Sequence, residues 1–127
     1  MIPPPEPELD SEERRLFDKG LQEFNTGYYF ECHETLEDLW NGVRGPSRDF
    51  FQGLIQIAVA FYHLTRGNEA GARSLLERGL TRLAKYPDVY GGVRLQDLRA
   101  AAQDLKSRLD EGPVGEVDPA TLPRCRR

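Results

Sequence analysis

His33 and Glu37, which stand four residues apart, are the residues in this sequence best suited to chemistry. Positions i and i+4 of an α-helix lie on one face, so an imidazole and a carboxylate placed there can bind one metal ion or hydrogen-bond each other. Phe30 and Trp40 continue the same stripe on either side of the pair. Between two large aromatic side chains the pair is expected to be partly buried, and a buried carboxylate needs a positively charged or hydrogen-bonding partner.

A second row of polar side chains runs along the most apolar stretch of the chain, residues 46–66. At roughly 100° per residue its members lie within about 60° of one another. They are Asp49, Gln52, Gln56 and His63. Because a helix that is otherwise apolar is expected to be the buried centre of a bundle, the row should face inward or line a cleft.

If the two helices face each other, one candidate site contains His33, Glu37, Trp40, Gln52, Gln56 and His63. With His33, Glu37 and His63 as metal ligands, two imidazoles and a carboxylate would suit zinc, iron or manganese and leave positions open for water or substrate. In the alternative interpretation, Glu37 accepts hydrogen bonds from His33, Gln56 or Arg48, and this network fixes the register of the two helices. A catalytic acid–base pair without metal is the third possibility.

Helices separated by glycine and proline are expected to position these residues. Asp10 and Glu13 provide a capping-box start for the first helix, which Gly27 ends. The other helices are expected over residues 28–41, 46–66, 68–85 and 95–109. The fold class is therefore all-α, a single-domain bundle of about five helices. Its domain spans residues 10–111, between an extended segment 1–9 and an extended or disordered, proline-containing tail 112–127. Glycines inside the predicted helices, at positions 20, 53, 71 and 79, indicate close approach between helices.

Composition excludes several classes of protein. The net charge of −4 argues against a nucleic-acid binder. The longest apolar run, residues 54–64, is about half of the ~20 residues that a membrane span needs. The N-terminus has neither the basic nor the apolar region of a secretory signal, so we expect a cytoplasmic protein. Cys32 and Cys125 are too few and too far apart in sequence to indicate a disulfide framework, and we expect reduced thiols.

The residues around the His–Glu pair resemble the prokaryotic family known as domain of unknown function 309. The family's HxxxExxW pattern appears here from His33 to Trp40, and residues 24–31, residues 48–56 and the following His63 are also similar to the family. The resemblance covers roughly residues 12–110. It implies a helical domain and suggests a metal-binding role for the histidine, glutamate and tryptophan of the motif, but it brings no known activity.

The sequence therefore predicts a small soluble helical protein with a metal-binding His/Glu site between two helices. The alternative is a non-catalytic interaction or scaffolding module in which the same residues form a structural hydrogen-bond network. Enzymatic activity stays undecided, since no nucleophile or cofactor loop is defined. The third helix also has more apolar surface than a few short helices can cover. We expect the two chain ends to cover it in a monomer, with a two-fold homodimer as the alternative.

Overall fold

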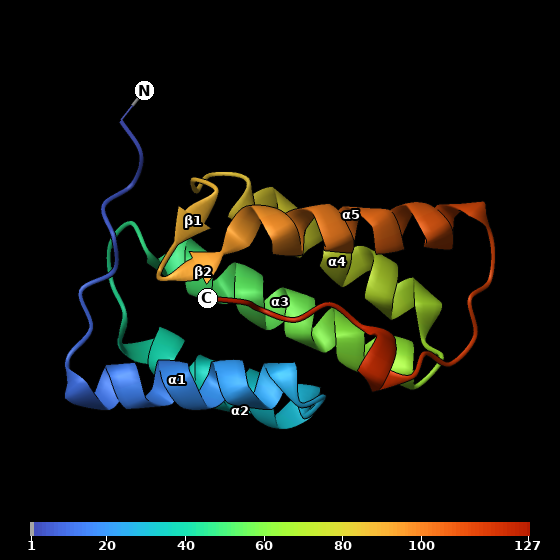
Figure 1. Ribbon diagram of the computed structural model, residues 1–127, viewed down its shortest axis with the longest axis horizontal. Coiled ribbons are helices and arrows are strands. Elements are labelled where there is room, and N and C mark those ends of the chain that lie inside the picture. Colours follow the sequence, from blue (N-terminus) through green and yellow to red (C-terminus); the bar gives the residue numbers. More distant parts are fainter. Residues whose placement is uncertain (1) are drawn as a thin grey trace.

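The computed structural model describes residues 2–127 and consists mainly of five α-helices (Figure 1). They are α1 (Ser11–Asn25), α2 (Tyr29–Gly42), α3 (Arg48–Thr65), α4 (Glu69–Leu83) and α5 (Leu95–Glu111). A two-stranded hairpin, β1 (Val89–Tyr90) and β2 (Val93–Arg94), precedes α5, and a 3-10 turn covers Pro119–Thr121. The predicted all-α bundle is confirmed. No helix within the described residues is long and apolar enough to cross a membrane.

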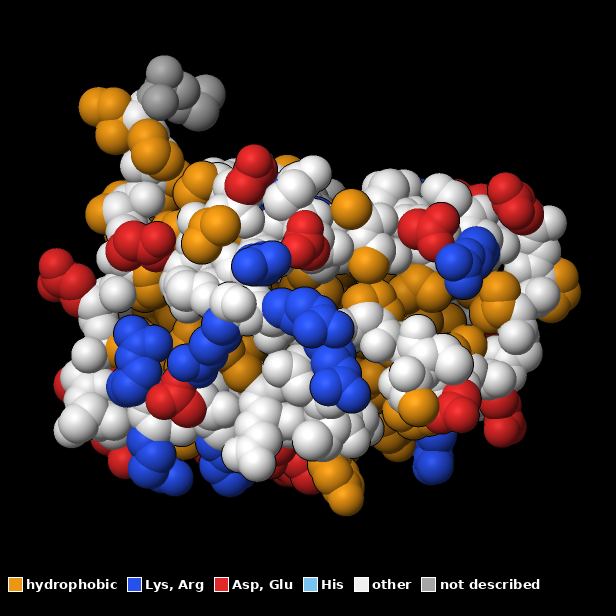
Figure 2. Space-filling model, viewed as in Figure 1, with side chains coloured by type: hydrophobic (Ala, Val, Ile, Leu, Met, Phe, Trp, Pro, Cys, Tyr) orange, Lys and Arg blue, Asp and Glu red, His pale blue; other side chains and the backbone are white. Residues whose placement is uncertain are grey.

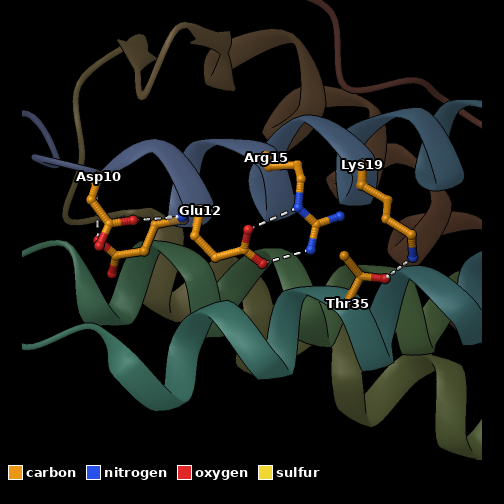
Figure 3. A network of polar contacts seen from close by, with 6 residues as sticks. Asp10, Glu12, Arg15, Lys19 and Thr35 are labelled. Atoms are coloured by element: carbon orange, nitrogen blue, oxygen red, sulfur yellow. Dashed lines mark hydrogen bonds and ion pairs between the residues drawn. The ribbon is translucent and has the colours of Figure 1, made fainter.

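The helix ends follow from local chemistry. Asp10 and Glu13 form the complete capping box at the start of α1, as the sequence predicts. Gly27 and Gly67 follow α1 and α3 with φ angles of 84° and 73°, a conformation that favours glycine. Figure 3 shows the capping box in the first turn of α1. Further along the helix it shows the hydrogen bond from Lys19 Nζ to Thr35 Oγ1 (3.0 Å), which joins α1 to α2.

Helix α3 is the centre of the bundle. It packs against α2 on one side and α4 on the other, while α1 covers α2 and α5 covers α4. Most residues of α3 are buried, and its aromatic side chains Phe50, Phe51 and Phe61 have no exposed surface. The expectation that the most apolar helix lies at the centre is therefore correct.

The hairpin is a feature that the sequence pattern does not predict. Val89 pairs with Arg94 and Tyr90 with Val93, and the turn uses Gly91 and Gly92 at positive φ. Strands of two residues are too short to show an alternating pattern. The ring of Tyr90 packs edge-on against Phe50, which joins the hairpin to the core.

Residues 112–127, which we call the strap, run across α3 between α1 and α5 (Figure 1). Leu122 and Cys125 of the strap are buried, and the Val117 N–H donates to the Leu64 carbonyl at the end of α3 (3.0 Å). The strap therefore covers apolar surface of α3. At the other end of the chain Ile2 is 92% exposed, whereas Leu9 packs against the core.

Candidate functional site

His33 and Glu37 contact each other on the outer surface of α2. His33 Nε2 lies 2.8 Å from Glu37 Oε2, and the two side chains are 30% and 48% exposed. The spacing along one helix is enough to bring them together. Phe30 lies beside the imidazole, with ring centroids 5.8 Å apart. The pair is thus half in solvent and not enclosed by the two aromatic side chains.

His63 makes its contacts elsewhere. Its Nδ1 lies 3.2 Å from Asn68 Nδ2, in the turn between α3 and α4. A Cβ atom on Gly71 would lie 3.0 Å from its ring, so the imidazole packs against the first turn of α4. Within residues 2–127, no group of three or more His, Cys, Asp or Glu side chains is arranged to hold a metal ion. The three-ligand metal site stays a prediction without structural support.

The polar row on α3 is divided between two surroundings. Asp49, at the start of the row, forms ion pairs with Arg82 (3.5 Å) in the last turn of α4 and with Lys85 just after that helix. Gln52 is half-buried, whereas Gln56 is 9% exposed and its Oε1 has no hydrogen-bond partner. Within the described part of the chain, no hydrogen bond joins Gln56 to the His33–Glu37 pair. The predicted network across the two helices is therefore not formed.

Trp40 has a structural partner, Arg48, which the sequence offers as one of three possible hydrogen-bond donors to Glu37. The guanidinium of Arg48 stacks on the Trp40 ring, 3.9 Å from the centroid. Arg48 Nη1 also donates to the carbonyls of Trp40 (2.9 Å) and Val43 (2.8 Å). Arg48 thus satisfies carbonyl groups at the C-terminus of α2 and fixes the turn into α3.

Aromatic side chains near the pair remain open to solvent. Phe30 is 47% exposed, and its ring lies 5.7 Å from that of Tyr62 on α3. The guanidinium of Arg66 lies over the ring of Tyr62, 5.4 Å from its centroid. Tyr28, just before α2, is 60% exposed. The sequence places Phe30 in a partly buried stripe, but the contact of Phe30 with Tyr62 depends on how α3 is rotated and has no signal in the sequence.

The exposed side of α2 is acidic. Its acidic residues are Glu31, Glu34, Glu37 and Asp38, all exposed, and its sequence contains no lysine or arginine. Within residues 2–127, the carboxylates of α2 make one close contact with a Lys, Arg or His nitrogen, that of Glu37 with His33. We call the surface formed by Phe30, His33, Glu34, Glu37 and Tyr62 the acidic–aromatic face.

The model of the family described as domain of unknown function (DUF309) matches residues 17–75. The resemblance to this family is therefore confirmed over residues 17–75. A further relative is an uncharacterized protein of Aquifex aeolicus (strain VF5), 27% identical over 108 residues, which are 84% of this chain and 32% of the relative. The uncharacterized protein YpuF of Bacillus subtilis (strain 168) is 45% identical over 62 residues, 47% of this chain and 36% of the relative. The chain thus spans about a third of the length of these relatives.

The DUF309 segment contains α2 and α3 complete, and with them the whole acidic–aromatic face. Helix α5 and the strap lie outside it. The acidic–aromatic face therefore lies within the part of the chain that the family model matches, and the strap does not.

Proposed function

We propose that this chain is a non-catalytic protein-binding module and that its acidic–aromatic face binds a basic amphipathic helix of a partner protein. One observation carries the proposal. The exposed surface of α2 has several carboxylates and no lysine or arginine, and the same helix carries a half-exposed Phe30 that packs against Tyr62.

The chemistry of the face defines the chemistry of the partner. Phe30 and Tyr62 offer apolar area to leucine-like or aromatic side chains of a docked helix, as in helix-in-groove recognition. Glu34 and Glu37, about one and two turns along α2 from Phe30, can pair with lysine or arginine side chains beside that apolar contact. Charge complementarity of this kind raises association rates and excludes acidic partners.

The size of the relatives supports a modular role. The matched residues are about a third of each relative, so the DUF309 segment is carried within longer proteins. A helix pair whose connecting turn is fixed by Arg48 provides a rigid surface, which lowers the entropic cost of binding.

The test is a calorimetric titration of the full chain with a synthetic helical peptide that has leucine on one face and lysine on the other. Trp40, the single tryptophan, borders the face and provides a fluorescence readout of the same titration. We expect saturable binding that weakens at least tenfold in Phe30→Ala and in Glu34→Lys. The matched control Glu77→Lys changes an exposed carboxylate of α4 and should leave the affinity unchanged. A peptide with glutamate in place of lysine should not bind. Equal affinity for both peptides, or for wild type and Phe30→Ala, would contradict the proposal.

Metal binding at His33 and Glu37 is the alternative proposal. It is supported by the contact between His33 Nε2 and Glu37 Oε2 at 2.8 Å, which provides two ligands on one face. Zinc, iron and manganese sites in proteins need at least one more side-chain ligand, which His63 does not supply in this arrangement. Calorimetric titration with zinc, manganese or ferrous iron separates the two proposals. One equivalent of metal bound by wild type and lost in His33→Ala would favour the metal site.

A further inference from the structure

The strap occupies a groove that the helices leave open. Helices α1 and α5 are not among the pairs that pack extensively against each other, and the strap crosses α3 between them (Figure 1). Figure 2 shows Lys and Arg side chains gathered on this face, along the path of the strap. The groove is therefore a surface formed by folded helices and occupied by an extended segment.

The groove binds the strap largely through its backbone. The Asn25 side chain at the end of α1 accepts from the Cys125 N–H (2.7 Å) and donates to the Cys125 carbonyl (3.1 Å). The Arg94 N–H on β2 donates to the Arg126 carbonyl (2.8 Å). Arg127 forms an ion pair with Asp18 of α1. A carboxamide that contacts both polar groups of one residue is the kind of contact by which extended peptides are bound.

Apolar anchors complete the contact, and two hollows open to solvent lie along the strap. Leu122 and Cys125 are buried, whereas most other residues of the strap are exposed. A cavity of about 580 Å³, lined by Asn25, Arg94 and Cys125 among others, remains beside the strap. A second cavity of about 470 Å³ lies under Pro119 and Leu122. The strap is thus attached at a few points, and its release exposes less apolar surface than unfolding of the bundle does.

We propose that this groove also binds the strap of a second copy of the chain, so that two copies exchange residues 117–127. The occupant is specified by the structure itself, because the groove already binds this sequence. Gly112 and Gly115, among the first residues of the strap, have φ angles of 159° and 70°, so the backbone after α5 can turn there, although the Val114 N–H between them donates to Glu69 Oε1 (2.8 Å). The exchanged contacts are the same as the intramolecular ones, so the exchange costs little apart from the entropy of association.

The test uses two full-length variants that complement each other. One has a damaged strap, Leu122→Asp, and an intact groove. The other has a damaged groove, Asn25→Ala with Asp18→Arg, and an intact strap. Maleimide labelling followed by peptide mass analysis measures the reactivity of Cys125, which is buried only while its strap is bound. Alone, each variant should label at Cys125 at least tenfold faster than wild type.

On mixing, the strap of the groove-damaged copy should enter the groove of the strap-damaged copy. Cys125 of the groove-damaged copy should then become at least tenfold less reactive, and light scattering should detect a heterodimer. Cys125 of the Leu122→Asp copy should stay reactive and serves as the internal control. If mixing leaves the labelling rate of Cys125 unchanged and light scattering detects only monomers, the proposal is overturned. Slow labelling of Cys125 in both variants before mixing would also overturn it. If Leu122→Asp lowers the melting temperature of the bundle, Leu122→Ala replaces it in the same experiment.

Discussion

Arg48 stacks on the ring of Trp40 at 3.9 Å and donates to two carbonyls at the end of the same helix. The contact joins the last turn of α2 to the first turn of α3 and so sets the start of the helix pair that carries the acidic–aromatic face. It also gives Trp40, which the sequence suggests as part of a metal site, a structural role.

Arg48→Ala should therefore destabilise the fold by about 2 kcal/mol, since it removes a cation–π contact and two charge-assisted hydrogen bonds. Arg48→Lys keeps the charge but not the planar fork, and it should recover only part of the loss. Urea unfolding followed by circular dichroism measures both. Arg78→Ala on the exposed side of α4 is the matched control and should change stability by less than about 0.5 kcal/mol.

The glycines inside the helices give a second prediction. A Cβ atom on Gly79 would lie 2.8 Å from Ile57 Cδ1 and 3.2 Å from the Gly53 carbonyl, so α3 and α4 approach closely there. Gly79→Ala should destabilise the protein by more than 1 kcal/mol, even though alanine favours helix by about 1 kcal/mol. Gly42→Ala, at the end of α2 with no atom closer than 4.0 Å, should be neutral or stabilising in the same thermal unfolding assay. Equal effects of the two substitutions would contradict the close-approach explanation.

The helices could be predicted from the sequence because their ends depend on neighbouring residues, as in the Asp10–Glu13 capping box. The His33–Glu37 contact could be predicted for the same reason, since one helix fixes it. The direction of the His63 side chain could not be predicted. Helix α3 is apolar around most of its circumference, so its pattern does not determine its rotation, and the packing of α3 against α4 turns His63 toward Asn68. The stacking of Arg48 on Trp40 depends on the turn between two helices and has no local signal.

Buried tyrosines predict loss of stability at high pH. Burial raises the pKa of Tyr29 and of Tyr90 from 10.0 to about 12. The folded state therefore holds the phenol protons more tightly than the unfolded chain does. This contribution to stability is complete below pH 10.0, the unfolded pKa, and is lost as the pH rises toward 12. Unfolding midpoints measured across this range should fall, and the fall should be less steep in Tyr90→Phe. A midpoint that does not change between these pH values would contradict the prediction.

The last prediction concerns the His33–Glu37 pair. If these residues formed a buried network, His33→Ala would cost about 1–3 kcal/mol through a partner left without hydrogen bonds. Their side chains are 30% and 48% exposed, however, so water solvates Glu37 once the imidazole is removed. We expect His33→Ala to change the free energy of unfolding by less than about 1 kcal/mol, and added salt to reduce the difference further. Urea unfolding of His33→Ala, Glu37→Gln and the double variant measures the coupling between the two residues. A coupling above about 1.5 kcal/mol would show that the pair is more shielded from solvent than its exposure indicates, and would return it to the role of a structural network.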